Sequence, residues 1–342
     1  MEADSLPGRP QRNANPHQDL GNEQRMSDRM STDVQELLAE LERNMTSVVL
    51  GKPHVVRLCI VALLAGEHVL LEDVPGVGKT LIAKSLAKSV AGSFCRIQFT
   101  PDLLPSDILG GNIFNSRTGE FVYSAGPIFA NIVLADEINR SSPRTQSALL
   151  EAMSDRQVST DGVTHPLPKP FMVIATQNPF EFEGTYPLPE SQLDRFLLRT
   201  KIGYPDREDE RRVLTSHQHG EPVDELTPVL DCEQVLLLQR ATREVRIDDA
   251  IHDFLLDIAA ATRNSDELLA GISTRATLAL SRACQALALI ERRDFVTPDD
   301  VKRLAVPVLA HRVIPKGFLH SGSSETAEKQ IERMVDEVPV PG

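Results

Sequence analysis

The 342-residue sequence predicts an α/β fold, a parallel sheet sandwiched by helices and followed by an all-helical domain. Short apolar runs bounded by turn residues are the first indication, because they are typical of buried parallel strands. Between these runs lie segments whose apolar residues have helical spacing, as expected when helices cover both faces of a parallel sheet. Beyond residue 205, helical periodicity continues without a convincing strand. The predicted strands are 69–71, 94–99, 132–135, 171–175 and 197–202.

Composition and periodicity divide the chain into four segments. Residues 1–30 are rich in Pro, Asn, Gln and Arg and lack an apolar period, so we predict a disordered tail. The remaining segments are the α/β core over 31–205, a helical domain over 206–315 and a polar C-terminal tail over 316–342.

Two β-hairpins are predicted as insertions in the core, near 109–123 and 157–165. In the second, Asp161-Gly162 lies between two short alternating runs, which is a strong hairpin signal. Both segments interrupt the alternation of strands and helices and do not read as core elements. We therefore expect both hairpins to project from the body and to contact another molecule.

Composition limits the class of protein. Apolar residues make up 41% of the chain, enough for a globular core. The longest apolar run, 58–65, is far shorter than the roughly 20 residues of a membrane helix, and no signal peptide is visible. The four cysteines are widely spaced, as in reduced cytosolic proteins, so a cytoplasmic location is predicted. A net charge of −13 argues against a large nucleic-acid footprint.

A phosphate-binding loop is predicted directly after the first strand, at Asp73-Val74-Pro75-Gly76-Val77-Gly78-Lys79-Thr80. A helix follows from Leu81, so backbone N–H groups and the helix dipole would face a nucleotide's phosphates. Lys79 would reach the β- and γ-phosphates, and the Thr80 hydroxyl would ligate Mg²⁺. The pattern has glycine where this chain has Asp73, a residue type that tolerates unusual backbone angles. The alternative is a Gly/Pro turn before an ordinary helix.

Acidic and amide side chains follow two other predicted strands. Asp136 and Glu137 come directly after 132–135, and ligands of open parallel sheets bind beyond the carboxyl ends of the strands. Asp136 is therefore a candidate to hold Mg²⁺, and Glu137 to polarise an attacking water as general base. Asn178 follows 171–175 and would orient that water or contact the γ-phosphate. An Asx-type turn before a proline is the alternative for Asn178, and the residues alone favour it.

The order of these motifs resembles that of AAA+ ATPases, and the residues within them closely resemble those of the MoxR family. The resemblance covers roughly residues 30–315 and leaves the N-terminal segment out. It rests on six stretches, namely 70–80, 98–110, 135–140, 146–153, 175–179 and the stretch 189–196 that contains Leu193-Asp194-Arg195-Phe196.

The resemblance implies roles that spacing does not give. Asn178 corresponds to the sensor-1 residue, and Arg195 to an arginine finger that reaches the γ-phosphate of a neighbouring subunit. Arg275 corresponds to the sensor-2 arginine of a helical lid. Gly51 and Lys52 match the segment at the adenine pocket, with Lys52 in place of the commoner Gln.

Arg140 and Arg144 are further candidates for contacts across a subunit interface. The two hairpins resemble inserts that, in related proteins, point toward the axis of a ring. ATP and Mg²⁺ are the implied cofactors, bound at the interfaces of a hexameric homo-oligomer. The implied activity is ATP hydrolysis to ADP and phosphate, in a chaperone-like remodeller or activator of protein complexes. A von Willebrand factor A domain protein and a protein client are the implied partners.

Three other functions stay open at this point. A nucleic-acid motor would carry similar hairpins, although the acidic charge argues against it. A metal-chelatase motor subunit would share the same ATPase core. A nucleotide-gated scaffold without turnover would bind ATP through the same loop, although Glu137 and Arg195 argue for hydrolysis.

Overall fold

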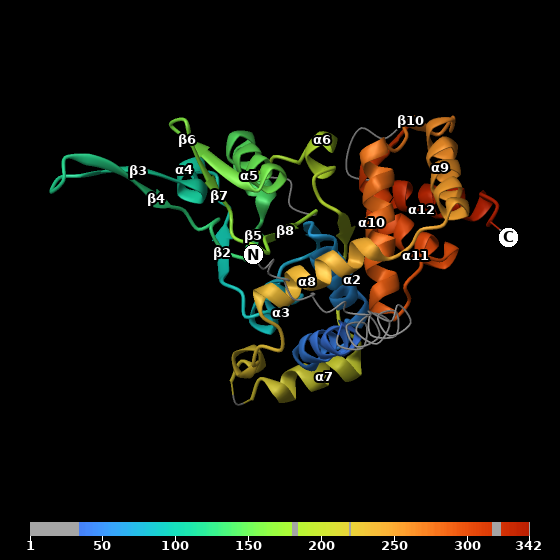
Figure 1. Cartoon of the computed structure of the whole chain (residues 1–342), viewed down its shortest axis with the longest axis horizontal. Coiled ribbons are helices and arrows are strands. Elements are labelled where there is room, and N and C mark those ends of the chain that lie inside the picture. The colour runs from blue at the N-terminus through green and yellow to red at the C-terminus, as the bar shows by residue number, and fades with distance from the viewer. Residues whose placement is uncertain (1–33, 180–183, 219, 317–322, 342) are drawn as a thin grey trace, which may run out of the picture.

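The computed structural model describes residues 34–179, 184–218, 220–316 and 323–341 (Figure 1). The predicted disordered tail over 1–30 lies outside the described residues. Within the described part of the chain, no helix is both long and apolar enough to cross a bilayer.

The centre of the molecule is a parallel sheet of five strands, counted over the described residues, in the order β2-β5-β8-β1-β9. The predicted fold class, a parallel sheet between helices with a helical domain after it, is confirmed. The strands are β1 (Val69–Glu72), β2 (Phe94–Gln98), β5 (Ile132–Asp136), β8 (Met172–Gln177) and β9 (Leu198–Thr200).

The register of the sheet places several chain segments at one edge. Glu72, the last residue of β1, pairs with Gln177 at the end of β8. Gln98, the last residue of β2, pairs with Asp136 at the end of β5. The phosphate-binding loop after β1 and the acids at the end of β5 therefore meet at the same carboxyl edge.

The sheet separates two hydrophobic cores, because successive side chains of a strand point to opposite faces. Val69 and Leu71 of β1 pack in the core shared with helix 34–48, α2, α3 and the helical domain, whereas Leu70 faces the other core. Leu149 and Leu150 of α5 cover that second core. The helices around the sheet are 34–48, α2 (Pro53–Ala65), α3 (Lys79–Ser89), α4 (Pro105–Leu109), α5 (Pro143–Asp155) and α6 (Glu190–Leu193), with the 3-10 turn η1 (Ile138–Arg140).

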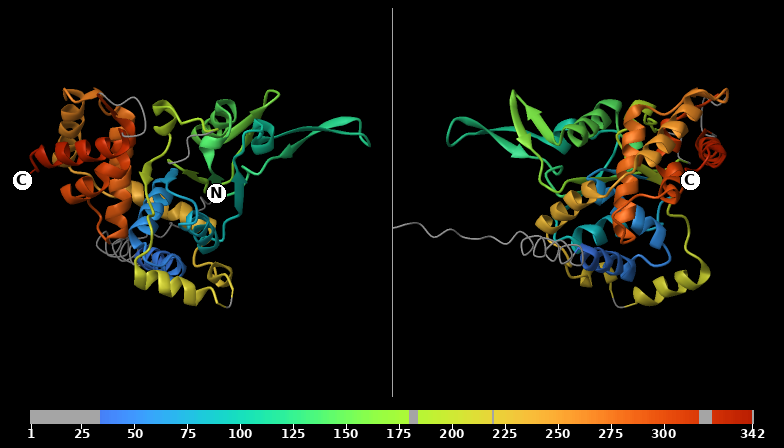
Figure 2. Two further views of the ribbon diagram at one scale, coloured as in Figure 1. Left: turned by 180° about the vertical axis from the view of Figure 1, so that it is seen from behind. Right: turned by 45° about the vertical axis from the view of Figure 1, so that its right-hand side comes forward.

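Two hairpins stand on the side of the sheet away from the helical domain (Figures 1 and 2). They occupy the segments where the sequence predicts them. The longer hairpin extends well beyond the body of the molecule (Figure 1). The hairpins are β3 (Gly110–Asn115) with β4 (Glu120–Ala125), and β6 (Gln157–Thr160) with β7 (Val163–Pro166).

The helical domain packs against α2 through α8 and α10, whereas α7 and η2 precede it and lie beside the core (Figure 1). Its helices are α8 (Cys232–Glu244), α9 (Asp249–Arg263), α10 (Thr274–Ile290), α11 (Pro298–Leu309), η3 (Ala310–Arg312) and α12 (Ser323–Glu337). The remaining elements of this half are α7 (Arg207–Ser216), η2 (Pro222–Glu225) and the small antiparallel pair β10 (Leu268–Ala270) and β11 (Ile314–Pro315).

The predicted polar tail over 316–342 is wrong for most of its length. Residues Ser323–Glu337 form α12, which packs against α9 and α11. The apolar residues of this segment are few, but they repeat at helical spacing and form one buried stripe. Composition alone therefore concealed an amphipathic helix. The stripe consists of Ala327, Ile331, Met334, Val335 and Val338.

We predict that α12 contributes to stability through this stripe. Ile331 is 0% exposed, so Ile331→Ala should lower the free energy of unfolding by about 2–5 kcal/mol. Urea unfolding followed by circular dichroism measures the change. Lys329→Ala, at an exposed position of the same helix, is the matched control and should change stability by less than about 0.5 kcal/mol. Equal stability of the two variants would contradict the docking of α12.

Candidate functional site

The predicted loop and acids line one cavity of about 680 Å³ at the carboxyl edge of the sheet. One end is polar and contains the phosphate-binding loop with Asp136 and Glu137. The other end is mainly apolar and is built by helix 34–48, the segment after β9, and α7. The lining includes Val48, Val49, Lys52, residues 75–82, Arg96, Asp136, Glu137, Tyr204, Val213, Leu214 and His217.

The loop has the backbone conformation that its glycines predict. Gly76 has φ 87° and Gly78 has φ 98°, both in the left-handed region that L side chains rarely adopt. Gly78 is the N-cap of α3, so the free N–H groups of the first helical turn face the cavity. Lys79 Nζ donates a hydrogen bond to the Asp73 carbonyl at 2.7 Å. Burial lowers the pKa of the Lys79 ammonium, and the charges of Asp136, Asp73 and Glu137 oppose that shift.

Asp73, the departure from the loop pattern, has a structural role. Its φ is not positive, so this position needs no glycine for backbone freedom. Asp73 Oδ1 accepts a hydrogen bond from the Val74 N–H at 2.8 Å. Oδ2 accepts from the N–H groups of Ile202 at 2.8 Å and Gly203 at 2.6 Å. The carboxylate therefore ties the loop to the chain that follows β9 and carries Tyr204 to the cavity wall.

The two acids are held together by Thr176 of β8. The Thr176 hydroxyl donates to Asp136 Oδ1 at 2.6 Å and accepts from the Glu137 N–H at 2.9 Å. Glu137 lies in the left-handed region with φ 58°, an uncommon conformation for a non-glycine residue. The Thr176 bridge fixes that turn, and both acids line the same cavity as the loop.

Polar residues of β2 contact both acids. Arg96 donates to Asp136 Oδ2 through Nε at 3.1 Å and Nη2 at 2.5 Å, and Asp136 is only 8% exposed. Gln98 Nε2 donates to Glu137 Oε2 at 2.9 Å, and Arg140 Nη1 lies 3.2 Å from the same oxygen. Both carboxylates therefore have fixed orientations.

Sequence reasoning missed Arg96, Gln98 and Thr176. A signal for the first two was available, because polar side chains at alternating positions of a short strand share one face of it. Arg96 and Gln98 contact the acids because β2 lies next to β5 in the sheet. That pairing depends on the order of the strands in the sheet, which local patterns do not give. Thr176 lies one residue from the end of β8, inside the stretch 175–179 that drew attention to Asn178.

The apolar end of the cavity suits a flat aromatic base. Lys52 Nζ donates to the Tyr204 carbonyl at 2.8 Å. Gly51 has φ 72°, and a Cβ at this position would overlap the Asp209 carboxylate, so glycine is needed here. The predicted adenine segment, Gly51 and Lys52, thus adjoins the cavity, and Lys52 lines it through its own side chain.

Besides Gly51 and Val74, which adjoin lining residues in the chain, three predicted site residues do not line this cavity. Asn178 follows β8, and its carbonyl accepts a hydrogen bond from Asn139 at 3.4 Å. Arg195 Nη1 donates to the Leu150 carbonyl at 2.6 Å and to Ser154 Oγ at 2.8 Å, both on α5.

Arg275, the third of these residues, lies at the start of α10 with its side chain 58% exposed. Its Nε is 3.7 Å from Asp194 Oδ2, in the residue that precedes Arg195. The two arginines therefore belong to one region that is separate from the nucleotide-type cavity. Of the other candidates, Arg140 contacts Glu137, and Arg144 is exposed on the first turn of α5.

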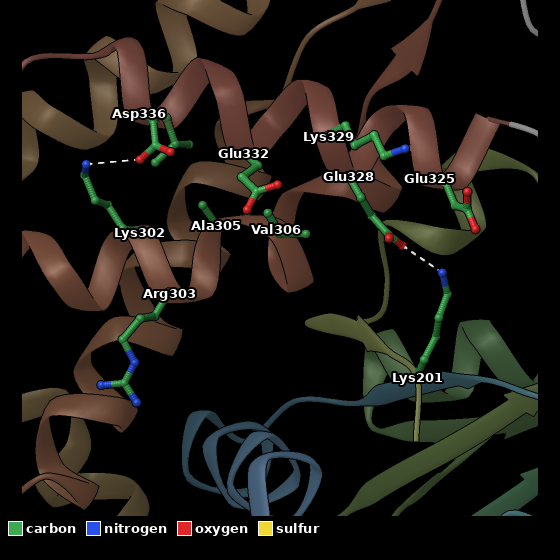
Figure 3. Close-up of a pocket in the computed structure, with 11 residues that line it drawn as sticks. Lys201, Lys302, Arg303, Ala305, Val306, Glu325, Glu328, Lys329, Glu332 and Asp336 are labelled. Atoms are coloured by element: carbon green, nitrogen blue, oxygen red, sulfur yellow. Dashed lines mark hydrogen bonds and ion pairs between the residues drawn. The ribbon is translucent and has the colours of Figure 1, made fainter. Parts of the chain in front are cut away.

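A second cavity, of about 620 Å³, lies between α11, α12 and Lys201 (Figure 3). Its charges are of both signs, and pairs such as Lys302–Asp336 at 3.2 Å and Lys201–Glu328 at 3.5 Å cross its wall. It contains no residue of the phosphate-binding loop. The chemistry of phosphate binding therefore belongs to the first cavity alone of these two.

Comparisons with known proteins agree with this geometry. The family described as "ATPase family associated with various cellular activities (AAA)" matches residues 68–198, and the "AAA lid domain" matches 260–334. A crystal structure of a candidate ATPase from Cytophaga hutchinsonii superposes with a TM-score of 0.85 at 36% identity. It covers 94% of this chain and 99% of its own.

Curated relatives are similar over most of their length. "Uncharacterized protein YeaC" of Bacillus subtilis is 48% identical over 310 residues, which is 90% of this chain and 97% of that protein. "Chaperone MoxR1" of Mycobacterium tuberculosis is 43% identical over 276 residues, 78% of this chain and 73% of that protein.

The sheet, the phosphate-binding loop, the paired acids and the helical lid define an AAA+ ATPase. With the similarity to MoxR1 over most of both chains, the protein belongs to the MoxR family of these ATPases, as its motifs predict.

The contacts of Asp73 yield a prediction. Asp73→Gly, which restores the common loop pattern, should leave the Ile202 and Gly203 N–H groups without their acceptor and lower stability by about 1–3 kcal/mol. Nucleotide affinity should fall as well, because the Tyr204 wall loses its tie to the loop. Asp73→Asn keeps an acceptor oxygen and is the matched control. Thermal unfolding and titration with ATP measure both effects, and tighter binding by Asp73→Gly would contradict this role.

Proposed function

We propose that the protein hydrolyses ATP with Mg²⁺ at the interfaces of a ring-shaped homo-oligomer and uses the cycle to remodel or activate protein complexes. The observation that carries the proposal is the single cavity that joins the Lys79 loop to the fixed pair Asp136 and Glu137. A hexamer is the ring we propose.

Residues of the chain account for binding within one subunit. The loop N–H groups and Lys79 bind the β- and γ-phosphates, while the base lies against Tyr204, Val213 and Val48. The residues fit Mg²⁺, since a nucleotide site needs only one or two protein ligands and the phosphates supply the rest. Thr80 and Asp136 would hold this ion, which neutralises phosphate charge when bound.

Proton transfer is the proposed role of Glu137. Glu137 lines the cavity together with Lys79. Gln98 and Arg140 hold its carboxylate, and Thr176 holds its backbone N–H. A carboxylate at this place accepts the proton of a water that attacks the γ-phosphate. Asn178 would orient that water when the β8 end adjusts to nucleotide.

The site requires a second copy of the chain. Arg195 and Arg275 lie together near Asp194, away from the cavity of their own subunit. A guanidinium stays charged and donates several N–H groups in a fixed fork, which suits transition-state phosphate oxygens. We therefore assign both arginines to the cavity of the neighbouring subunit, where Arg195 acts as the arginine finger.

The hairpins are the proposed contact with a client. The β3–β4 hairpin exposes four large apolar side chains, and it is linked to β6–β7 by the Asn112–Asp161 hydrogen bond at 2.5 Å. Tyr123 and His165 also stack between the hairpins with ring centroids 3.8 Å apart. We propose that the hairpins act together on a protein client, with a von Willebrand factor A domain protein as a further partner. The exposed apolar residues are Ile113, Phe114, Phe121 and Val122.

Loss of the general base should separate binding from turnover. Glu137→Gln removes the proton acceptor but keeps the cavity, so ATP binding should persist while hydrolysis falls by about 10²–10⁴-fold. Lys79→Ala should instead weaken ATP binding itself, because it removes the cation at the phosphates. Phosphate release and binding of a fluorescent ATP analogue measure the two steps. Normal turnover by Glu137→Gln would eliminate the proposed role of this residue.

Loss of the arginine finger should be rescued by another subunit. Arg195→Ala should bind ATP and reduce turnover by about 10³–10⁵-fold. In rings mixed with Glu137→Gln subunits, activity should return, because those subunits supply an intact Arg195 to intact cavities. Arg282→Ala, which breaks a surface ion pair of α10 with Glu67, is the control and should keep activity. Absence of rescue at every mixing ratio would count against action between subunits.

A further inference from the structure

The segment that carries Arg195 is fastened to the helical domain by one buried residue, Arg312 of η3. The Arg312 side chain is only 3% exposed. Nε donates to Asp194 Oδ1 at 2.8 Å, and Nη2 donates to the carbonyls of Phe196 at 2.7 Å and Asp194 at 3.3 Å. Nη1 donates to the Leu197 carbonyl at 3.1 Å and to the Val308 carbonyl at 2.6 Å.

The neighbouring residue strengthens this attachment. His311 Nε2 lies 3.1 Å from the Phe196 carbonyl and is fully enclosed. Burial lowers the pKa of His311 well below its usual value. Because a carbonyl oxygen only accepts hydrogen bonds, Nε2 is the donor in this contact. His311 and Arg312 thus hold the backbone on both sides of Arg195.

Asp194 divides its two oxygens between two arginines. Oδ1 pairs with the buried Arg312, and Oδ2 faces the exposed Arg275 at 3.7 Å. Arg275 lies on α10 and Arg312 on η3, so the same carboxylate contacts two parts of the helical domain. The next residue along the chain is Arg195. Asp194 therefore contacts Arg275 through its carboxylate and directly precedes Arg195 in the chain. These are the two arginines that we assign to the neighbouring cavity.

We propose that Asp194 and Arg312 are positioning residues that set the geometry of Arg195 and Arg275 for the neighbouring subunit's nucleotide. The inference rests on the proposed function, in which these arginines act between subunits. Asp194 fixes the direction of Arg275 through charge, and Arg312 fixes the backbone from which Arg195 projects. Any movement of the helical domain would then shift both arginines together.

Substitutions of the two side chains remove different interactions and should cause similar defects. Asp194→Asn keeps an acceptor oxygen for Arg312 but removes the charge that holds Arg275. Arg312→Lys keeps a buried cation but cannot make the fork of hydrogen bonds to Asp194, Phe196 and Leu197. Because misplacement of a catalytic group by about 1 Å can cost about 10²-fold in rate, we expect a fall in kcat of that order for both variants. The KM for ATP should change little, since the cavity of each variant subunit is intact.

Rings assembled from two variants test the inference. A variant with misplaced arginines should regain turnover in such rings, whereas a variant that has lost its structure should not. Asp194→Asn subunits are mixed with Glu137→Gln subunits, which carry an intact Asp194, Arg195, Arg275 and Arg312. Turnover should return, because the Glu137→Gln subunits supply well-placed arginines to the intact cavities of Asp194→Asn subunits. Arg312→Lys should be rescued in the same way. Asp336→Asn, which breaks the Lys302 ion pair on the surface of the helical domain, is the matched control and should keep turnover unmixed.

The Arg195→Ala and Glu137→Gln mixture runs beside this test. Rescue of Asp194→Asn together with Arg195→Ala supports the inference. Rescue of Arg195→Ala without rescue of Asp194→Asn or Arg312→Lys overturns it and leaves the proposed function intact. A loss of ATP binding by Asp194→Asn, or normal kcat in both variants, also overturns it. Absence of rescue in every mixture contradicts the action of arginines between subunits, on which the inference depends.

Discussion

Parallel pairing of β1, β5 and β8 is the constraint on which the rest of the site depends. It brings the ends of three strands, separated by long stretches of sequence, to one edge of the sheet. There the Thr176 hydroxyl of β8 contacts both acids that follow β5, while β1 delivers the phosphate-binding loop. A shift of one residue in either pairing would turn these side chains to the other face and would separate the acids from the loop.

The same sheet links the nucleotide edge to the helical domain. Alternate side chains of each strand enter two different cores, one shared with the helical domain and the other covered by α5. Arg195 contacts α5, and the residues on both sides of it contact η3. The arginine region is therefore attached to both halves of the molecule, whereas the loop and the acids lie at the carboxyl edge of the sheet. In the ring that we propose, a site divided in this way would respond to the arrangement of subunits.

Much of the fold could be predicted from the sequence, and so could the meeting of the loop and the two acids at one cavity. Short apolar runs predicted the strands. Local patterns placed Lys79 and Thr80 at the start of the helix that follows the loop, and Asp136 and Glu137 at the end of another strand, where the structure has them. The contacts of Arg96 and Thr176 depend on strand order and register, which a single sequence does not specify. Arg275 was expected at the nucleotide but lies beside Asp194, since its place depends on how α10 packs. Helix α12 was missed because its charged residues outnumber a buried stripe that only periodicity reveals.

Asp73 has a consequence for how such loops are recognised. A search pattern that insists on glycine at the first position would pass over this chain, although the loop keeps its shape through Gly76 and Gly78. In this chain the residue at the first position connects two segments, because its carboxylate accepts hydrogen bonds from two backbone N–H groups of the chain beyond β9. That segment continues to Tyr204 in the cavity wall, so the loop and this part of the wall are connected. In the nucleotide site that we propose, this connection would couple recognition of the phosphates to recognition of the base.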